Sequence, residues 1–184
     1  PVPAAPAQPS HSSRPAQPSQ FTLLRQRRFL PFFLTQFCGA FNDNLYKNAL
    51  VVLFTFQAAQ MTTLQPAVLV NLAGGIFILP FFLFSATCGQ IADKFEKSRL
   101  IRFTKLLEIA VMGLGAVAFA LHSLPLMLGT LFLMGAQSTL FGPVKYAILP
   151  QTLREHELIG GNALVEAGTF VSILIGTIPA VLLV

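Results

Sequence analysis

The longest charge-free run sets the strongest limit on what this chain can fold into. Asn48 to Ala92 is a stretch of 45 residues without Asp, Glu, Lys, Arg or His, and Ile109 to Val144 holds 36 residues with only His122. A single membrane-spanning helix needs roughly 20 apolar residues. Each run is therefore expected to hold two membrane spans joined by a turn.

The overall composition argues against a water-soluble protein. Only 10% of the 184 residues are charged, against about 25% in an ordinary soluble domain. So few charges cannot cover a globule of this size with polar surface, which speaks against a soluble enzyme. The net charge of +5 could indicate nucleic-acid binding, but most of the basic residues flank apolar tracts. We interpret them as topology signals and expect no nucleic-acid partner.

Five apolar tracts predict an all-α membrane protein with five spans. They are Phe29 to Phe56, Pro66 to Ile91, Arg102 to Leu121, Leu124 to Phe141 and Gly161 to Val184. The connection from Asp93 to Lys105 has five basic residues, whereas Ala58 to Gln65 has none. Basic connections mark the cytoplasmic side. We therefore expect the N-terminus, this basic connection and residues 142–160 to lie in the cytoplasm.

The two ends of the chain differ from its middle. Residues 1–20 contain six of the thirteen prolines, a composition typical of a disordered tail. The chain begins without Met and stops at Val184 inside an apolar tract, so we expect it to be part of a longer polypeptide. Residues 21–184 would then be a partial half-bundle of five spans, whose partner is a C-terminal half-bundle outside this chain.

Sequence motifs for catalysis are missing. The only cysteines, Cys38 and Cys88, suggest neither a disulfide framework nor a zinc site by number or spacing. No Ser-His-Asp arrangement or glycine-rich phosphate loop occurs. We therefore expect no enzymatic activity, no metal and no cofactor.

Polar residues interrupt the first apolar tract. They are Gln36, Asn42, Asp43, Asn44, Lys47 and Asn48. A charge at the bilayer centre costs at least about 2.5 to 3.5 kcal/mol. Asp43 and Lys47 are four residues apart, so we expect them to pair on one helix face. The pair could only hold helices together, but so many neighbouring amides favour a substrate or coupling site.

Other polar residues and glycines offer weaker signals. Glu108 is expected to pair with Lys105 or Arg102, and Glu166 is either functional or an interfacial carboxylate. Gly142 and Pro143 together predict that the fourth helix ends or kinks there. The pair Gly160 and Gly161 is expected to break the chain before the last span.

One connection resembles a family signature. The segment between the second and third tracts contains Gly89, Asp93, Lys94, Lys97 and Arg99. This pattern resembles the loop that joins helices two and three in the major facilitator superfamily, although Glu96 replaces the usual second glycine. Gly89 would let two helices approach closely, and Asp93 would cap a helix or pair with a base to hold one gate state. The alternative is an ordinary basic cytoplasmic loop.

Two longer segments, Gln36 to Leu50 and Ala136 to Gln151, resemble the lysophospholipid transporter branch of that superfamily. Its members move lysophospholipids across the bacterial inner membrane and are sometimes fused to an acyltransferase. The resemblance implies that this chain is the first five helices of a twelve-helix bundle. It also implies that residues 42, 43, 44, 47 and 48 line the translocation path. Its cytoplasmic end would be formed by Gly142, Pro143, Lys145 and Tyr146.

The expected function is transport of lysophospholipids by alternating access in a multi-pass inner-membrane protein. Lys47 is the candidate partner of the phosphate, while Asp43 neutralises it or meets the head-group amine. Two alternatives remain: a major facilitator transporter of another small solute, and the membrane portion of a fused acyltransferase.

Overall fold

The computed structural model describes residues 20–182. Its elements are η1 (Gln20–Arg25), α1 (Leu30–Met61), α2 (Pro66–Lys94), α3 (Lys97–Ala120), α4 (Leu124–Thr152), η2 (Glu155–Glu157) and α5 (Leu158–Leu182). No strand occurs in this part of the chain, which confirms the all-α expectation. The predicted tail lies outside the described residues, apart from Gln20, which begins η1.

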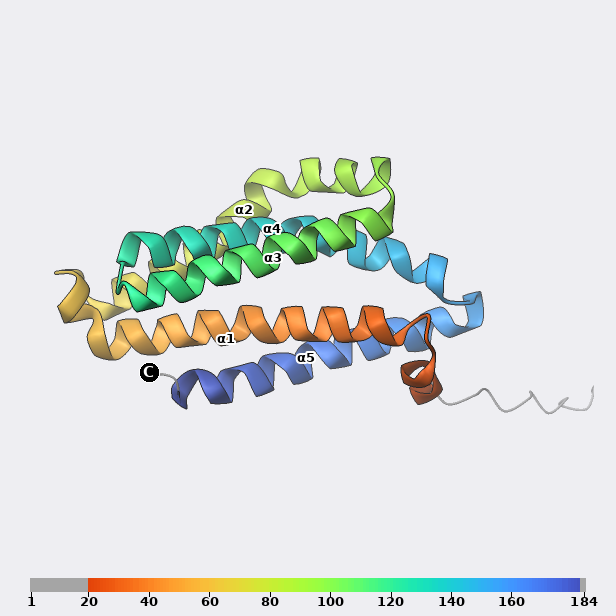
Figure 1. Cartoon of the computed structure of the whole chain (residues 1–184), viewed down its shortest axis with the longest axis horizontal. Coiled ribbons are helices and arrows are strands. Elements are labelled where there is room, and N and C mark those ends of the chain that lie inside the picture. The colour runs from red at the N-terminus through yellow and green to blue at the C-terminus, as the bar shows by residue number, and fades with distance from the viewer. Residues whose placement is uncertain (1–19, 183–184) are drawn as a thin grey trace, which may run out of the picture.

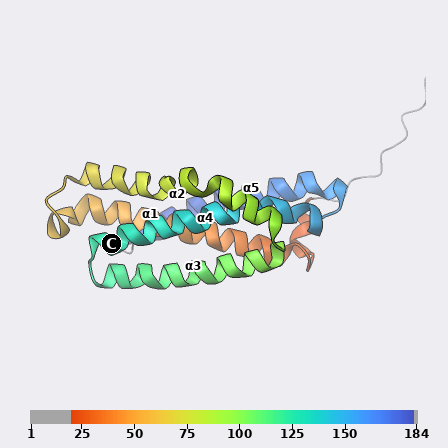
Figure 2. The same cartoon turned by 90° about the horizontal axis from the view of Figure 1, so that it is seen from above.

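The helices run back and forth in two layers. Helices α1 and α5 lie side by side in one layer, and α2, α3 and α4 form the other (Figure 1). Within the second layer, α4 lies between α2 and α3 (Figure 2). The start of α1 and the α2–α3 and α4–α5 connections are at one end of the bundle, and the other two connections are at the opposite end.

Local sequence explains where several helices begin. Pro31, Pro66 and Pro125 each lie in the first turn of a helix, where the missing N–H of proline has no helical partner to lose. The short α3–α4 connection turns at His122, which has a φ of 48°. This left-handed conformation reverses the chain within three residues.

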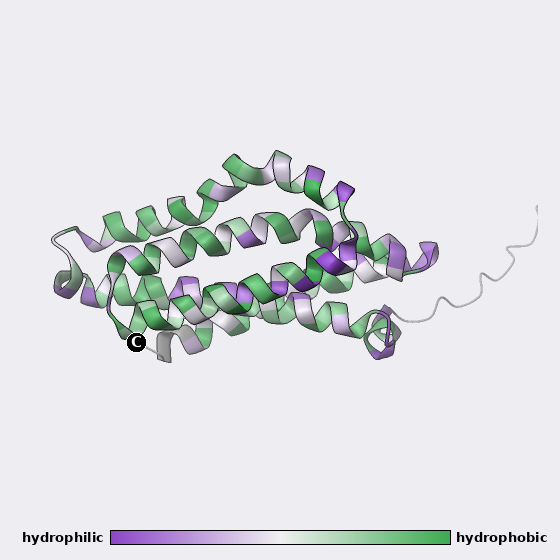
Figure 3. Cartoon of the chain, turned by 45° about the horizontal axis from the view of Figure 1, so that its top comes forward, coloured by the Kyte–Doolittle hydropathy of each residue, from purple (hydrophilic) through white to green (hydrophobic). Residues whose placement is uncertain are grey.

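Four segments are long and apolar enough to cross a membrane: Pro66–Lys94, Lys97–Ala120, Leu124–Thr152 and Glu155–Pro179. Hydrophobic residues cover most of their length (Figure 3). Helix α1 has 32 residues, but the polar residues between positions 36 and 48 interrupt its apolar surface. The chain is therefore a multi-pass membrane protein, and the span formed by α1 stays a prediction.

The helix end expected at Gly142 and Pro143 and the break expected at Gly160 and Gly161 do not occur, whereas a kink at Pro143 stays a prediction. Helix α4 continues through Pro143 and Pro150 to Thr152, because buried apolar residues such as Val144 and Leu149 keep it packed. Gly160 and Gly161 lie inside α5 and do not break it. A Cβ atom at Gly161 would clash with the side chain of Leu153, so this glycine serves close packing.

The predicted connection from Asp93 to Lys105 is also much shorter in the structure. Helix α2 extends to Lys94 and α3 begins at Lys97, which leaves only Phe95 and Glu96 between them. Lysine, arginine and glutamate are good helix formers. The charged residues therefore continue both helices beyond their apolar parts.

Helices α2 and α4 are in close contact at Gly135. A Cβ atom there would clash with the backbone carbonyl of Phe77 and lie 3.1 Å from Pro80 Cγ. A larger residue at this position would separate α2 and α4. Ser138, which follows in α4, donates a hydrogen bond to Asp43 of α1.

The end of the bundle that carries α1's N-terminus is tied together by Arg28. Its guanidinium pairs with Glu157 at 2.6 Å and donates to the Thr152 carbonyl at 3.0 Å. This contact fixes the start of α1 against the α4–α5 connection.

Candidate functional site

A cavity of about 320 Å³ lies between the two layers and is lined by residues from all five α-helices. We call it the central cavity. Its charged lining residues are Asp43, Lys47, Lys105, Glu108 and Lys145. Three phenylalanines, at positions 77, 81 and 141, line it as well. The cavity thus combines opposite charges with apolar aromatic surface.

The predicted ion pair between Asp43 and Lys47 is absent from the described residues, where the two groups are not within 4.0 Å. Asp43 Oδ2 accepts a hydrogen bond of 2.9 Å from Ser138, and Lys47 Nζ lies 4.4 Å from the centre of the Phe77 ring. Neighbouring helices supply these partners, which spacing along α1 could not show. The lysine is therefore held by an aromatic face and not by a carboxylate.

Two buried polar atoms of α1 have no hydrogen-bond partner among residues 20–182. They are Asp43 Oδ1 and Asn42 Nδ2. Buried polar atoms are normally paired, so each can accept or donate one more bond. Asp43 lines the central cavity, whereas Asn42 lines a second cavity of about 490 Å³ between α1 and α3.

The remaining amides of the predicted stripe have different roles. Gln36 donates to Thr169 at 2.7 Å and Asn48 donates to Thr177 at 3.1 Å, so both connect α1 to α5. Asn44 donates to the Ala40 carbonyl of its own helix. Gln36 and Asn44 also line the central cavity, and Asn48 lies outside that lining.

The sequence predicts the pairing of Lys105 with Glu108 but not the place of the pair. The two groups are 2.6 Å apart, and Gln137 of α4 donates to the same Glu108 oxygen at 3.1 Å. Lys105 and Glu108 line both cavities together with Gly39 of α1. The sequence signal that could have indicated this site is a lysine and a glutamate one turn apart within an apolar tract.

Lys145 and Glu166 connect α4 to α5 at 3.1 Å, and Tyr146 donates to the same Glu166 oxygen at 2.6 Å. Lys145 is only 8% exposed and lines the central cavity, as does Gly142. Of the four residues that the resemblance places at the end of the path, Gly142 and Lys145 line the cavity, whereas Pro143 and Tyr146 do not. Asn162, which lies about one turn before Glu166 in α5, is exposed.

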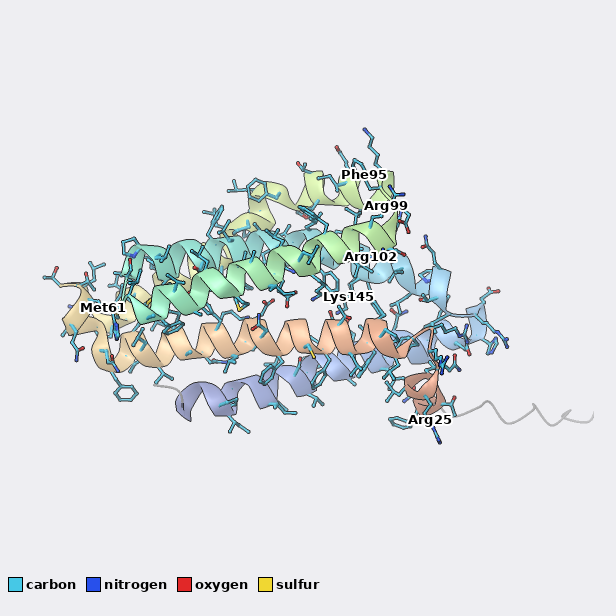
Figure 4. All side chains as sticks on the ribbon, viewed as in Figure 1. Arg25, Met61, Phe95, Arg99, Arg102 and Lys145 are labelled. Atoms are coloured by element: carbon cyan, nitrogen blue, oxygen red, sulfur yellow. The ribbon has the colours of Figure 1, made fainter. Side chains whose placement is uncertain are left out.

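The residues of the predicted gating loop lie at the basic end of the bundle, with Arg99, Arg102 and Arg25 at that end and Met61 at the other (Figure 4). A Cβ atom at Gly89 would meet nothing within 4 Å. Residues 20–182 therefore supply no close helix neighbour at Gly89, and the expectation that this glycine permits a close approach stays a prediction.

Asp93 and its neighbours in this loop are exposed or half-exposed. Lys97 donates to the Asp93 carbonyl, and Glu96 pairs with Arg99 at 3.5 Å. Such exposed pairs contribute little to stability. The Asp93 carboxylate thus remains available for a partner outside residues 20–182, and its gating role stays a prediction.

Asp93→Asn in the complete protein is expected to slow transport at least about tenfold, since a charged hydrogen bond contributes about 1.5 to 3 kcal/mol. Its thermal stability should not change, because the side chain is exposed. Initial transport rates and unfolding temperatures measure both effects. Glu96→Gln, which removes the neighbouring exposed charge, is the control. Normal rates for Asp93→Asn would contradict a gating role.

The amino-acid sequence of this chain is similar to those of known proteins. A sequence model described as the Major Facilitator Superfamily matches residues 6–184. The lysophospholipid transporter LplT of Salmonella arizonae is 31% identical over 157 residues, which cover 85% of this chain and 36% of that protein. LplT of Escherichia coli K12 is 30% identical over 145 residues, or 79% of this chain and 34% of that protein.

This chain therefore spans about a third of the length of the curated relatives that it matches. No solved structure matches it. The family match covers nearly the whole chain, and the apolar helices in two layers agree with it. The chain belongs to the major facilitator superfamily.

Proposed function

We propose that the complete protein is a transporter that moves lysophospholipids across the bacterial inner membrane by alternating access. The observation that carries this proposal is the central cavity, where the ammonium of Lys47 has no carboxylate of residues 20–182 within 4.0 Å. Two relatives named as lysophospholipid transporters support the choice of cargo.

The cavity suits each part of such a cargo. Lys47 can bind the phosphate by a charge-assisted hydrogen bond, and Asp43 Oδ1 can accept a hydrogen bond from a head-group amine. Phe77, Phe81 and Phe141 offer apolar surface to the single acyl chain. An amphipathic lipid thus meets polar and apolar groups in one cavity.

Alternating access requires a second half-bundle opposite the first. In transporters of this kind the two halves rock about a site near the middle of the membrane. We infer that this chain supplies one wall of the site and that a C-terminal half-bundle supplies the other. An acyltransferase fused to such a transporter would act on the lipid that the transporter delivers.

Transport by purified complete protein in proteoliposomes tests the proposal. We expect uptake of lysophosphatidylethanolamine and none of monoacylglycerol, which has an acyl chain but no phosphate. Protein-free liposomes give the background rate of spontaneous flipping. Equal uptake of both lipids, or a rate equal to the background, would overturn the proposal.

We expect the basic end of the bundle to lie in the cytoplasm, because basic connections stay on that side. Single cysteines at Ser98 and Thr63, both exposed, should be labelled from opposite sides of the membrane in a protein without Cys38 and Cys88. A membrane-impermeant thiol reagent added to intact cells should reach position 63 only. Labelling at position 98 would show that the basic end of the bundle lies outside the cytoplasm and would contradict the prediction.

A further inference from the structure

We propose that Lys105 of α3 is a second ammonium that binds the cargo's phosphate, and that Glu108 holds it in place when no cargo is bound. This inference rests on the proposed function. The residues that the sequence predicts to contact the cargo lie on α1, α4 and α5. Lys105 lies on α3 and adds this helix to the site.

The position of Lys105 supports this role. Its ammonium lines the central cavity and lies 4.3 Å from the centre of the Phe141 ring. Lys47 lies similarly over Phe77. Asp43, Lys47 and Lys105 all line the central cavity. The two ammonium groups therefore reach the same part of the cavity from opposite layers, one from α1 and one from α3.

Gly39 makes room for the ammonium. A Cβ atom at Gly39 would clash with Lys105 Nζ and lie 3.2 Å from Glu108 Oε1. Lysine 105 therefore extends as far as the backbone of α1. A purely structural ion pair within α3 would not need to reach a neighbouring helix at a glycine.

Glu108 can release Lys105 without becoming an unpaired buried charge. Breaking a buried pair is costly when one charge is left without any partner. Here Gln137 also donates to Glu108, at 3.1 Å. If Lys105 turns from Glu108 to a phosphate, Glu108 keeps this hydrogen bond and the ammonium exchanges one anion for another. Gln137 is thus a positioning residue for the exchange.

Equilibrium binding to the purified complete protein tests the inference, with lysophosphatidylethanolamine and monoacylglycerol as probes. The double change Lys105→Gln and Glu108→Gln removes both charges and leaves neither partner unpaired. We expect it to weaken binding of the phospholipid about tenfold or more, with binding of monoacylglycerol unchanged. Arg102→Gln, one turn earlier on α3 and exposed, should change neither.

Gly39→Ala gives an independent readout because it keeps both charges. The added methyl group displaces the ammonium, so phospholipid binding should weaken while binding of monoacylglycerol stays the same. Unchanged phospholipid binding in both variants, or an equal loss for both lipids, would overturn the role of Lys105. If the unmodified protein does not prefer the phospholipid, the proposed function itself fails.

Discussion

Lys47→Gln in the complete protein is expected to reduce lysophospholipid transport roughly 100-fold, since a hydrogen bond to a charged group contributes about 1.5 to 3 kcal/mol. The substitution keeps a polar side chain of similar length and removes only the positive charge. Uptake into proteoliposomes, with the amount of folded protein measured in the same sample, gives the effect.

The structure makes this single substitution a clean test. In the described part of the chain Lys47 has no carboxylate within 4.0 Å, and Asp43 keeps its hydrogen bond from Ser138 when Lys47 is replaced. The contact with Phe77 is lost, at a cost of about 0.5 to 2 kcal/mol. The protein should therefore remain folded, and a transport defect would report on the site.

Arg27→Gln is the control for Lys47→Gln. Arg27 is an exposed basic residue that precedes α1, so its replacement also removes one positive charge, outside the cavity lining and the gating loop. It should leave transport unchanged. Stable Lys47→Gln protein that transports at the normal rate would end the assignment of Lys47 to the phosphate.

Gly135→Ala is expected to lower the free energy of unfolding by about 1 to 3 kcal/mol, the usual cost of overpacking. The new methyl group would meet the carbonyl of Phe77, and a backbone atom cannot rotate away as the end of a side chain can. Helices α2 and α4 must then separate. Thermal unfolding of the purified complete protein measures the loss.

Gly129→Ala separates this clash from the general effect of replacing glycine. Gly129 lies on the same helix, and a Cβ atom there would meet nothing within 4 Å. Alanine favours helix more than glycine does, so this variant should be as stable as the unmodified protein or slightly more stable. Equal stability of both variants would show that α2 and α4 do not depend on close contact at Gly135.

Much of the helix pattern could be predicted from the sequence. Apolar tracts of sufficient length gave the approximate position of every α-helix, because lipid admits only segments that satisfy their own backbone hydrogen bonds. Their ends were less predictable. Pro143 and Gly161 are locally unfavourable in a helix, but packing by residues such as Val144 and Leu153 outweighs that preference.

The sequence by itself determined the class of protein, since its few charges and long apolar runs allow only a membrane bundle, and it marked Asp43 and Lys47 as candidate site residues. Only the tertiary structure decided their partners. Asp43 meets Ser138 and Lys47 meets Phe77, while Lys105 and Glu108 join the cavity beside Gly39. Spacing along one helix fixes which side chains share a face, but the groups that face them come from helices distant in the chain.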